Sequence, residues 1–102
     1  MKLTDLEPRW INPERSVFIF RCPARPNDAW LSCKRVAMRI RDQMDMFREA
    51  VKDDAVKVVV PMEPDYCWAI SGDDFSTMTV SPSIDASKAG HWHGHITNGE
   101  IK

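Results

Sequence analysis

Residues 83–101 read SIDASKAGHWHGHITNGEI, and this histidine segment organises the predicted fold. It contains all the histidines of the chain, namely His91, His93 and His95. Trp92 lies between the first two, and the Asn98-Gly99 pair that follows favours a tight turn between antiparallel strands. We therefore predict a strand over residues 93–96, a turn, and a last strand at 100–101.

Upstream of this segment, apolar runs alternate with turn signals. Residues 16–22 are β-branched and aromatic, which predicts a buried strand, and the proline-containing stretch 23–28 ends it. Further strands are predicted over residues 56–60, 66–70 and 75–80. Residues 3–11, bounded by Pro8 and Pro13, predict an edge strand or an extended arm.

One long amphipathic helix is predicted over about residues 29–52, because apolar residues recur there at steps of three and four. The members of this apolar stripe are Cys33, Val36, Ala37, Ile40, Met44, Phe47 and Val51. Together with the strands, the helix predicts an α+β fold in which it packs on a mainly antiparallel sheet of four to six strands. The 102 residues contain no stretch typical of a linker, so we expect a single domain over 1–102.

The composition is typical of a globular domain, with 43% hydrophobic and 28% charged residues. No apolar run is long enough to span a membrane, and residues 1–10 do not resemble a secretory signal. The odd number of cysteines, three, favours a reducing compartment over a disulfide framework. We therefore expect no membrane partner and a cytoplasmic location.

Charge is distributed unevenly along the chain although the net charge is only −1. Residues 15–41 contain seven basic residues and one acidic residue, whereas residues 42–102 contain five basic and eleven acidic residues. This asymmetry indicates either two faces that attract each other within the fold or one face that attracts a partner. In the second case, the predicted partner-binding residues are Trp30, Lys34, Arg35, Arg39 and Arg41. The partner would be a protein, or the phosphates of a nucleic acid with Trp30 stacked on a base.

The alternating histidines also predict a metal site. Alternate side chains of a strand point to one face about 6.6 Å apart, and two such imidazoles can share a zinc ion with cysteine thiolates. The predicted ligands are His91, His93 and Cys22, with His95, Cys33 and Cys67 as second choices. The alternative is that Trp92 fills the core while the histidines are exposed or hydrogen-bonded.

The sequence also resembles a known family of small bacterial and phage proteins, catalogued as domain of unknown function 6527. The resemblance rests on SPSID at 81–85, GHWHG at 90–94 and the Cys22-Pro23 pair. Members of that family continue this pair into Cys-Pro-x-Cys, which implies a zinc site formed with the His-Trp-His. In this chain Arg25 stands at the position of the second cysteine. The resemblance implies no established activity.

Three functional hypotheses follow from these patterns and from the resemblance, and the phage or prophage type of the first is implied by the resemblance alone. The first is a non-enzymatic binding protein of phage or prophage type that presents its charged helix to a host protein, for instance a defence complex. The second is a zinc-stabilised or zinc-dependent domain, and the third is a nucleic-acid-binding module that uses residues 15–41. The sequence has no His-Glu-x-x-His motif and no nucleophile elbow, so we assign no catalytic residue.

Overall fold

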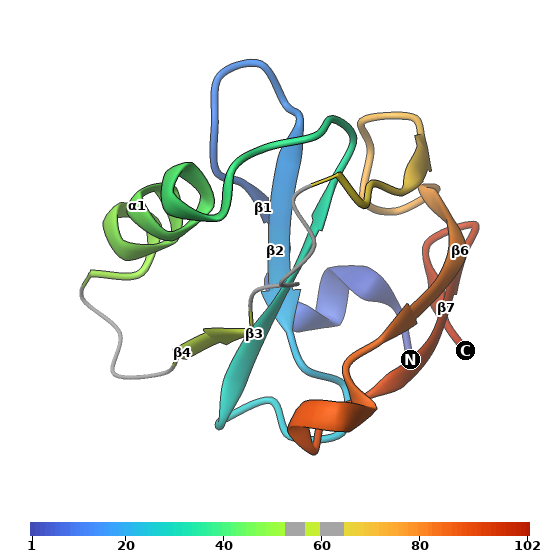
Figure 1. Cartoon of the computed structure of the whole chain (residues 1–102). Coiled ribbons are helices and arrows are strands. Elements are labelled where there is room, and N and C mark those ends of the chain that lie inside the picture. Colours follow the sequence, from blue (N-terminus) through green and yellow to red (C-terminus); the bar gives the residue numbers. More distant parts are fainter. Residues whose placement is uncertain (53–56, 60–64) are drawn as a thin grey trace.

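Two four-stranded sheets and one α-helix make up the computed structural model, which describes residues 1–52, 57–59 and 65–102 (Figure 1). The first sheet has the order β1 (Arg9–Trp10), β2 (Val17–Arg21), β3 (Ala29–Lys34) and β4 (Lys57–Val59). The second has the order β5 (Ala69–Ser71), β6 (Thr79–Asp85), β7 (His93–Thr97) and β8 (Glu100–Ile101). The helices are α1 (Ile40–Ala50) and the short 3-10 helices η1 (Leu3–Leu6) and η2 (Ser87–Ala89).

The first sheet is buried on both faces because it lies between α1 and the second sheet (Figure 1). On one face of β2, Phe18 and Phe20 belong to the core shared with the second sheet. On the other face, Val17 and Ile19 pack with Trp30 and with Phe47 of α1. A strand covered on both sides is apolar at nearly every position, which explains the continuous apolar run of β2.

The α+β class is confirmed, but the predicted helix over residues 29–52 is wrong in its first part. Ala29–Lys34 forms the strand β3, which pairs with β2 in antiparallel and with β4 in parallel orientation, and α1 begins only at Ile40. All six residues of β3 are buried. In a fully buried strand apolar residues also occur at the steps of three and four that are typical of a helical stripe. Periodicity alone therefore does not distinguish such a strand from part of a helix.

The histidine segment forms the predicted strands β7 and β8 around the Asn98-Gly99 turn. Both turn residues have positive φ angles, 49° and 75°, as the tight turn of a two-residue hairpin requires. A Cβ atom on Gly99 would lie 2.1 Å from the backbone oxygen of Ser76, so only glycine fits there. The N-terminus covers this edge of the sheet, since Leu3 N–H donates to Gly99 O and Ile101 N–H donates to Met1 O.

The remaining strand predictions are confirmed in part. The predicted strand over 16–22 is β2, and that over 66–70 overlaps β5, whereas the stretch 75–80 enters a strand only at Thr79. The predicted arm over 3–11 consists of η1 and β1. The prediction over 56–60 coincides with β4 at Lys57–Val59, and its two ends lie outside the described residues.

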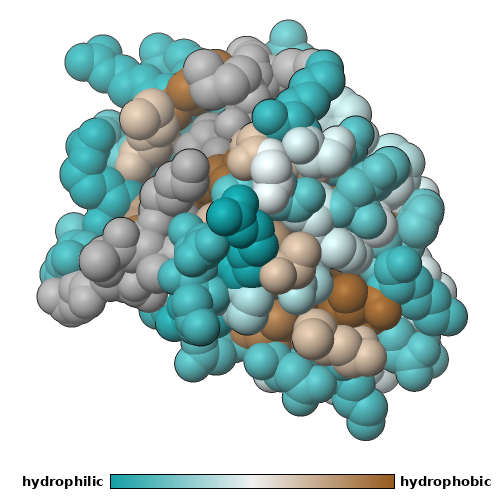
Figure 2. All heavy atoms as spheres, turned by 90° about the horizontal axis from the view of Figure 1, so that it is seen from below, coloured by the Kyte–Doolittle hydropathy of each residue, from teal (hydrophilic) through white to brown (hydrophobic). Residues whose placement is uncertain are grey.

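The face of the molecule that is seen from below in Figure 2 is mainly hydrophilic. Figure 2 shows one face of the molecule, on which hydrophobic residues form only small groups between hydrophilic ones. Within residues 1–52, 57–59 and 65–102, no helix combines the length and the apolar character that a membrane span needs.

Candidate functional site

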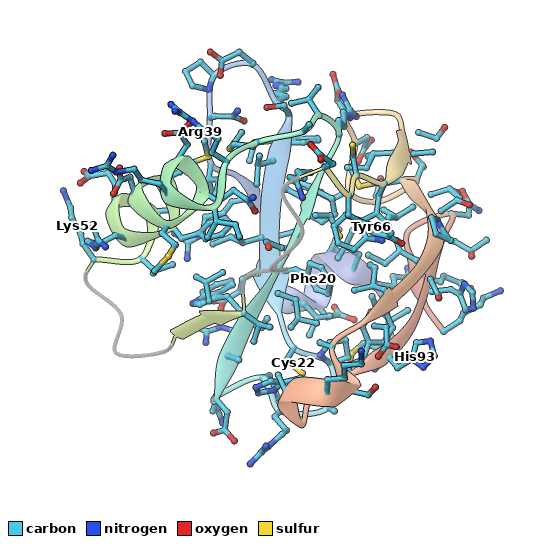
Figure 3. All side chains as sticks on the ribbon, viewed as in Figure 1. Phe20, Cys22, Arg39, Lys52, Tyr66 and His93 are labelled. Atoms are coloured by element: carbon cyan, nitrogen blue, oxygen red, sulfur yellow. The ribbon has the colours of Figure 1, made fainter. Side chains whose placement is uncertain are left out.

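The three histidines do not share one face of the sheet. His93 and His95 are exposed on β7, with Gly94 and Ile96 buried on the opposite face, and Figure 3 shows His93 pointing outward. His91 precedes the strand and is only 9% exposed. The predicted alternation therefore holds within β7 but does not extend to His91.

Trp92 packs against the core, as the alternative interpretation of this segment predicted. Its ring is 6.2 Å from that of Phe20, edge to face, and it joins the core between the two sheets. The indole lies over Gly94, where an added Cβ atom would be 2.4 Å from the Cζ2 atom of Trp92. Gly94 thus makes room for the side chain that joins the histidine segment to the core.

His91 follows a turn that contacts the loop after β2. Gly90 ends η2 with a φ angle of 80°, and His91 N–H donates to Ala86 O at 3.0 Å. The guanidinium of Arg25 donates to Gly90 O at 3.3 Å and pairs with Asp28 at 3.1 Å. The Nδ1 atom of His91 is buried and has no hydrogen-bond partner among the described residues.

The three cysteines are free and lie in different surroundings. Cys22 is fully buried in the core between the sheets (Figure 3). Burial raises the pKa of the Cys33 thiol, an effect that the neighbouring charge of Lys34 opposes only partly, so Cys33 is a poor source of a thiolate ligand. Cys67 is half-buried, and its Sγ atom donates to Asp65 O at 3.5 Å.

No three His, Cys, Asp or Glu side chains come together as a metal site in the part of the chain that the structure describes. Zinc binding by His91, His93 and Cys22 therefore stays a prediction from the sequence.

Two of the predicted partner-binding residues lie in the interior. Trp30 and Lys34 are 0% and 2% exposed, because they belong to β3 and not to an exposed helix. The structure therefore does not place them on the exposed helix face from which the sequence predicted partner contacts. Arg39 and Arg41 remain exposed at the start of α1.

Arg35 is engaged within the fold. Its guanidinium pairs with Asp73 at 2.9 Å, donates to Gly72 O and lies 4.9 Å from the ring centroid of Trp10. Arg15 lies 3.7 Å from the same Asp73 carboxylate. Part of the positive charge of residues 15–41 is thus paired within the molecule with an acidic residue of the later part of the chain. Nucleic-acid binding by residues 15–41 stays a prediction.

Two further carboxylates serve in turns. Asp74 and Asp85 each accept hydrogen bonds from the hydroxyl and the backbone N–H of the serine two residues later. These bonds lower the pKa of both carboxyl groups, and the nearby His93 contributes a smaller lowering at Asp85. This geometry is typical of an Asx turn.

The exposed side of α1 and of the segment before it contains Arg39 and Arg41, two of the residues predicted to bind a partner. We define the α1 surface by the five exposed residues Val36, Arg39, Arg41, Met44 and Arg48. Arg39 pairs with Asp42 and Arg48 with Asp45, each from one helical turn away. Arg41 makes no ion pair with any described residue. Val36 and Met44 were predicted as core residues of the helical stripe, but they are 49% and 47% exposed.

Comparison with known proteins gives no match to a family model, to a curated protein or to a solved structure.

Proposed function

We propose that this chain is a non-enzymatic binding protein whose α1 surface contacts another protein. The supporting observation is that Val36 and Met44 are two of the four exposed large hydrophobic side chains among the described residues. Both lie within nine positions of the chain, beside the arginines of the same surface. Methionine and arginine are typical of protein interfaces, where methionine adapts to irregular partners.

Packing of α1 supports the proposal because it holds this surface in place. On the inner side of the helix, Phe47 is buried against the first sheet, and Gln43 donates to Met38 O at 2.8 Å. A helix fixed in this way loses little conformational freedom when its outer side is covered.

Arg41 favours a partner that offers a carboxylate next to an apolar contact, since the other two arginines of the α1 surface already pair with Asp42 and Asp45. The guanidinium of Arg41 has a planar array of donors that can form a bidentate pair with one carboxylate. The partner class we propose is a host protein of a bacterium, as for a phage-encoded inhibitor of a defence complex.

A double variant tests the proposal in the full-length chain. Wild-type protein is immobilised, partners are captured from a bacterial lysate and identified, and the binding of each purified partner is then measured. We expect Arg41→Glu with Met44→Glu to raise the Kd at least about tenfold, equivalent to ~1.4 kcal/mol.

The matched control carries the same change in charge on the other side of the molecule, as Lys88→Glu with Thr97→Glu. Both positions are exposed, on η2 and β7. This control should bind as the wild type does. Equal binding by the wild type and both double variants would refute the assignment of the contact to the α1 surface. The absence of any specific partner would refute the proposed binding function.

A further inference from the structure

The turn between β7 and β8 contains a chemically labile pair of residues, Asn98 and Gly99. An asparagine that precedes glycine is prone to deamidation, because glycine has no side chain to hinder attack by its backbone nitrogen on the asparagine amide. Of the three asparagines in the chain, Asn98 alone precedes glycine. Asn98 is also exposed, so water reaches its side chain.

Hydrogen bonds of the fold engage the nitrogen that would attack. Gly99 N–H donates to Met78 O at 2.8 Å, and Asn98 N–H donates to the hydroxyl of Thr79 at 3.0 Å. Gly99 is buried, and its carbonyl accepts a hydrogen bond from Leu3 N–H at 2.8 Å. For the reaction, the Gly99 nitrogen must lose its proton and turn toward the Asn98 side chain. These hydrogen bonds therefore have to open first.

We propose that Asn98 is a site of spontaneous deamidation, and that opening of the β7–β8 turn sets the rate. In the open turn a solvent base removes the proton of Gly99 N–H, and the nitrogen forms a bond to Cγ of Asn98. The bond from Cγ to the side-chain nitrogen breaks, and this nitrogen leaves as ammonia. Water then opens the cyclic imide at either carbonyl, which yields aspartate or isoaspartate. The overall reaction consumes one water molecule and requires no other reactant.

The isoaspartate product changes the backbone at a closely packed place. It adds one carbon atom to the main chain of a two-residue turn, where a Cβ atom on Gly99 would already lie 2.1 Å from Ser76 O. The N-terminus is bonded to the same edge, since Leu3 N–H donates to Gly99 O and Ile101 N–H donates to Met1 O. The modification therefore weakens the attachment of the N-terminus to β8.

This site is distinct from the α1 surface. It lies between β7 and β8, whereas the α1 surface consists of residues after β3. The reaction also needs no protein partner. The inference can therefore fail while the proposed function stands, and the reverse also holds.

Mass spectrometry of the full-length chain tests the site. The wild type is incubated at mildly alkaline pH, folded in buffer or unfolded in urea, and the deamidation of each asparagine is followed over time. In urea we expect Asn98 to react faster than Asn27, which precedes the bulkier Asp28. Asn12 should not form the imide, because Pro13 has no N–H. In the folded chain the reaction at Asn98 should be at least about tenfold slower than in urea, because the turn opens only transiently.

Variants of Thr79 test whether the hydrogen bonds of the turn control the rate. Thr79→Val keeps the size of the side chain but removes the acceptor for Asn98 N–H. In the folded chain it should speed deamidation about fivefold, the factor that corresponds to the loss of one net hydrogen bond. Thr79→Ser keeps the hydroxyl and should react as the wild type does.

In urea the wild type and both variants should react at the same rate, because the turn no longer exists there. Three results would overturn the proposal: equal rates at Asn98 in the folded and unfolded wild type, faster reaction of Asn27 than of Asn98 in urea, or equal rates of folded Thr79→Val and Thr79→Ser. The first two use the wild type alone, so they remain decisive if a variant does not fold.

Discussion

Gly94 shows how one residue without a side chain can decide the position of a whole segment. The indole of Trp92 occupies the space next to its Cα atom and carries the histidine segment onto the core at Phe20. The φ angle of Gly94 is not positive, so glycine is required here for space and not for backbone conformation.

The first prediction concerns this contact. Gly94→Ala should lower the free energy of unfolding by about 1–3 kcal/mol, because the new methyl group forces the indole to move. Urea unfolding measures the loss. In a Trp92→Ala background the same substitution should cost much less, since the two residues are in contact. An equal cost in both backgrounds would show that Trp92 is not the obstacle.

The second prediction concerns pH. Burial raises the pKa of the Cys33 thiol in the folded chain, whereas an exposed thiol in the unfolded chain ionises near pH ~8.5. The contribution of Cys33 to stability is therefore complete below about pH 8.5 and is lost progressively above it, because the unfolded state then releases a proton that the folded state keeps.

Urea unfolding between pH 7 and pH 10 measures this effect, with Cys33→Ala as the comparison. The wild type should lose more stability over this range than the variant does. Parallel curves for the two proteins would contradict the buried, protonated thiol.

At the scale of elements, β3 and α1 show what the sequence could and could not predict. The periodicity of residues 40–51 predicted a helix correctly, because only one side of α1 is covered. Residues 29–34 were assigned to the same helix, since a strand buried on both faces has no period of two to reveal it. The error also explains why Trp30 and Lys34 were wrongly placed on an exposed surface.

The third prediction tests how α1 is attached. Phe47→Ala should destabilise the fold by about 3–5 kcal/mol, because Phe47 is buried against Val17, Ile19 and Trp30. Met44→Ala, on the exposed side of the same helix, should change stability by less than about 0.5 kcal/mol. Unfolding curves of both variants provide the measurement, and similar losses would contradict the assignment of inner and outer sides.

For the whole molecule, α1, the first sheet and the second sheet form three layers. The histidines, cysteines and arginines of the described residues are distributed over these layers and do not meet at one site. The sequence predicted the α+β class and the common face of His93 and His95, because both follow from local patterns. It did not predict two sheets of four strands, because the separation depends on contacts between distant segments such as β2 and Trp92. It also missed the exposure of Val36 and Met44, which depends on where α1 begins.

Asp73 illustrates the same limit for the charges. The uneven charge distribution indicated that the basic and acidic parts attract each other, and Asp73 pairs with Arg15 and Arg35 as expected. No local signal identified this aspartate among the eleven acidic residues of 42–102. The arginines that remain for external contacts could be recognised only after the internal pairs were known.

The central claim is that the α1 surface meets a protein partner. Site-specific photo-crosslinking in bacterial cells tests it most directly, with an apolar photoreactive residue introduced in place of Val36 or, as the control, in place of Lys88. The account predicts a discrete crosslinked adduct from position 36 and none from position 88. Adducts of equal intensity from both positions, or from position 88 alone, would contradict it.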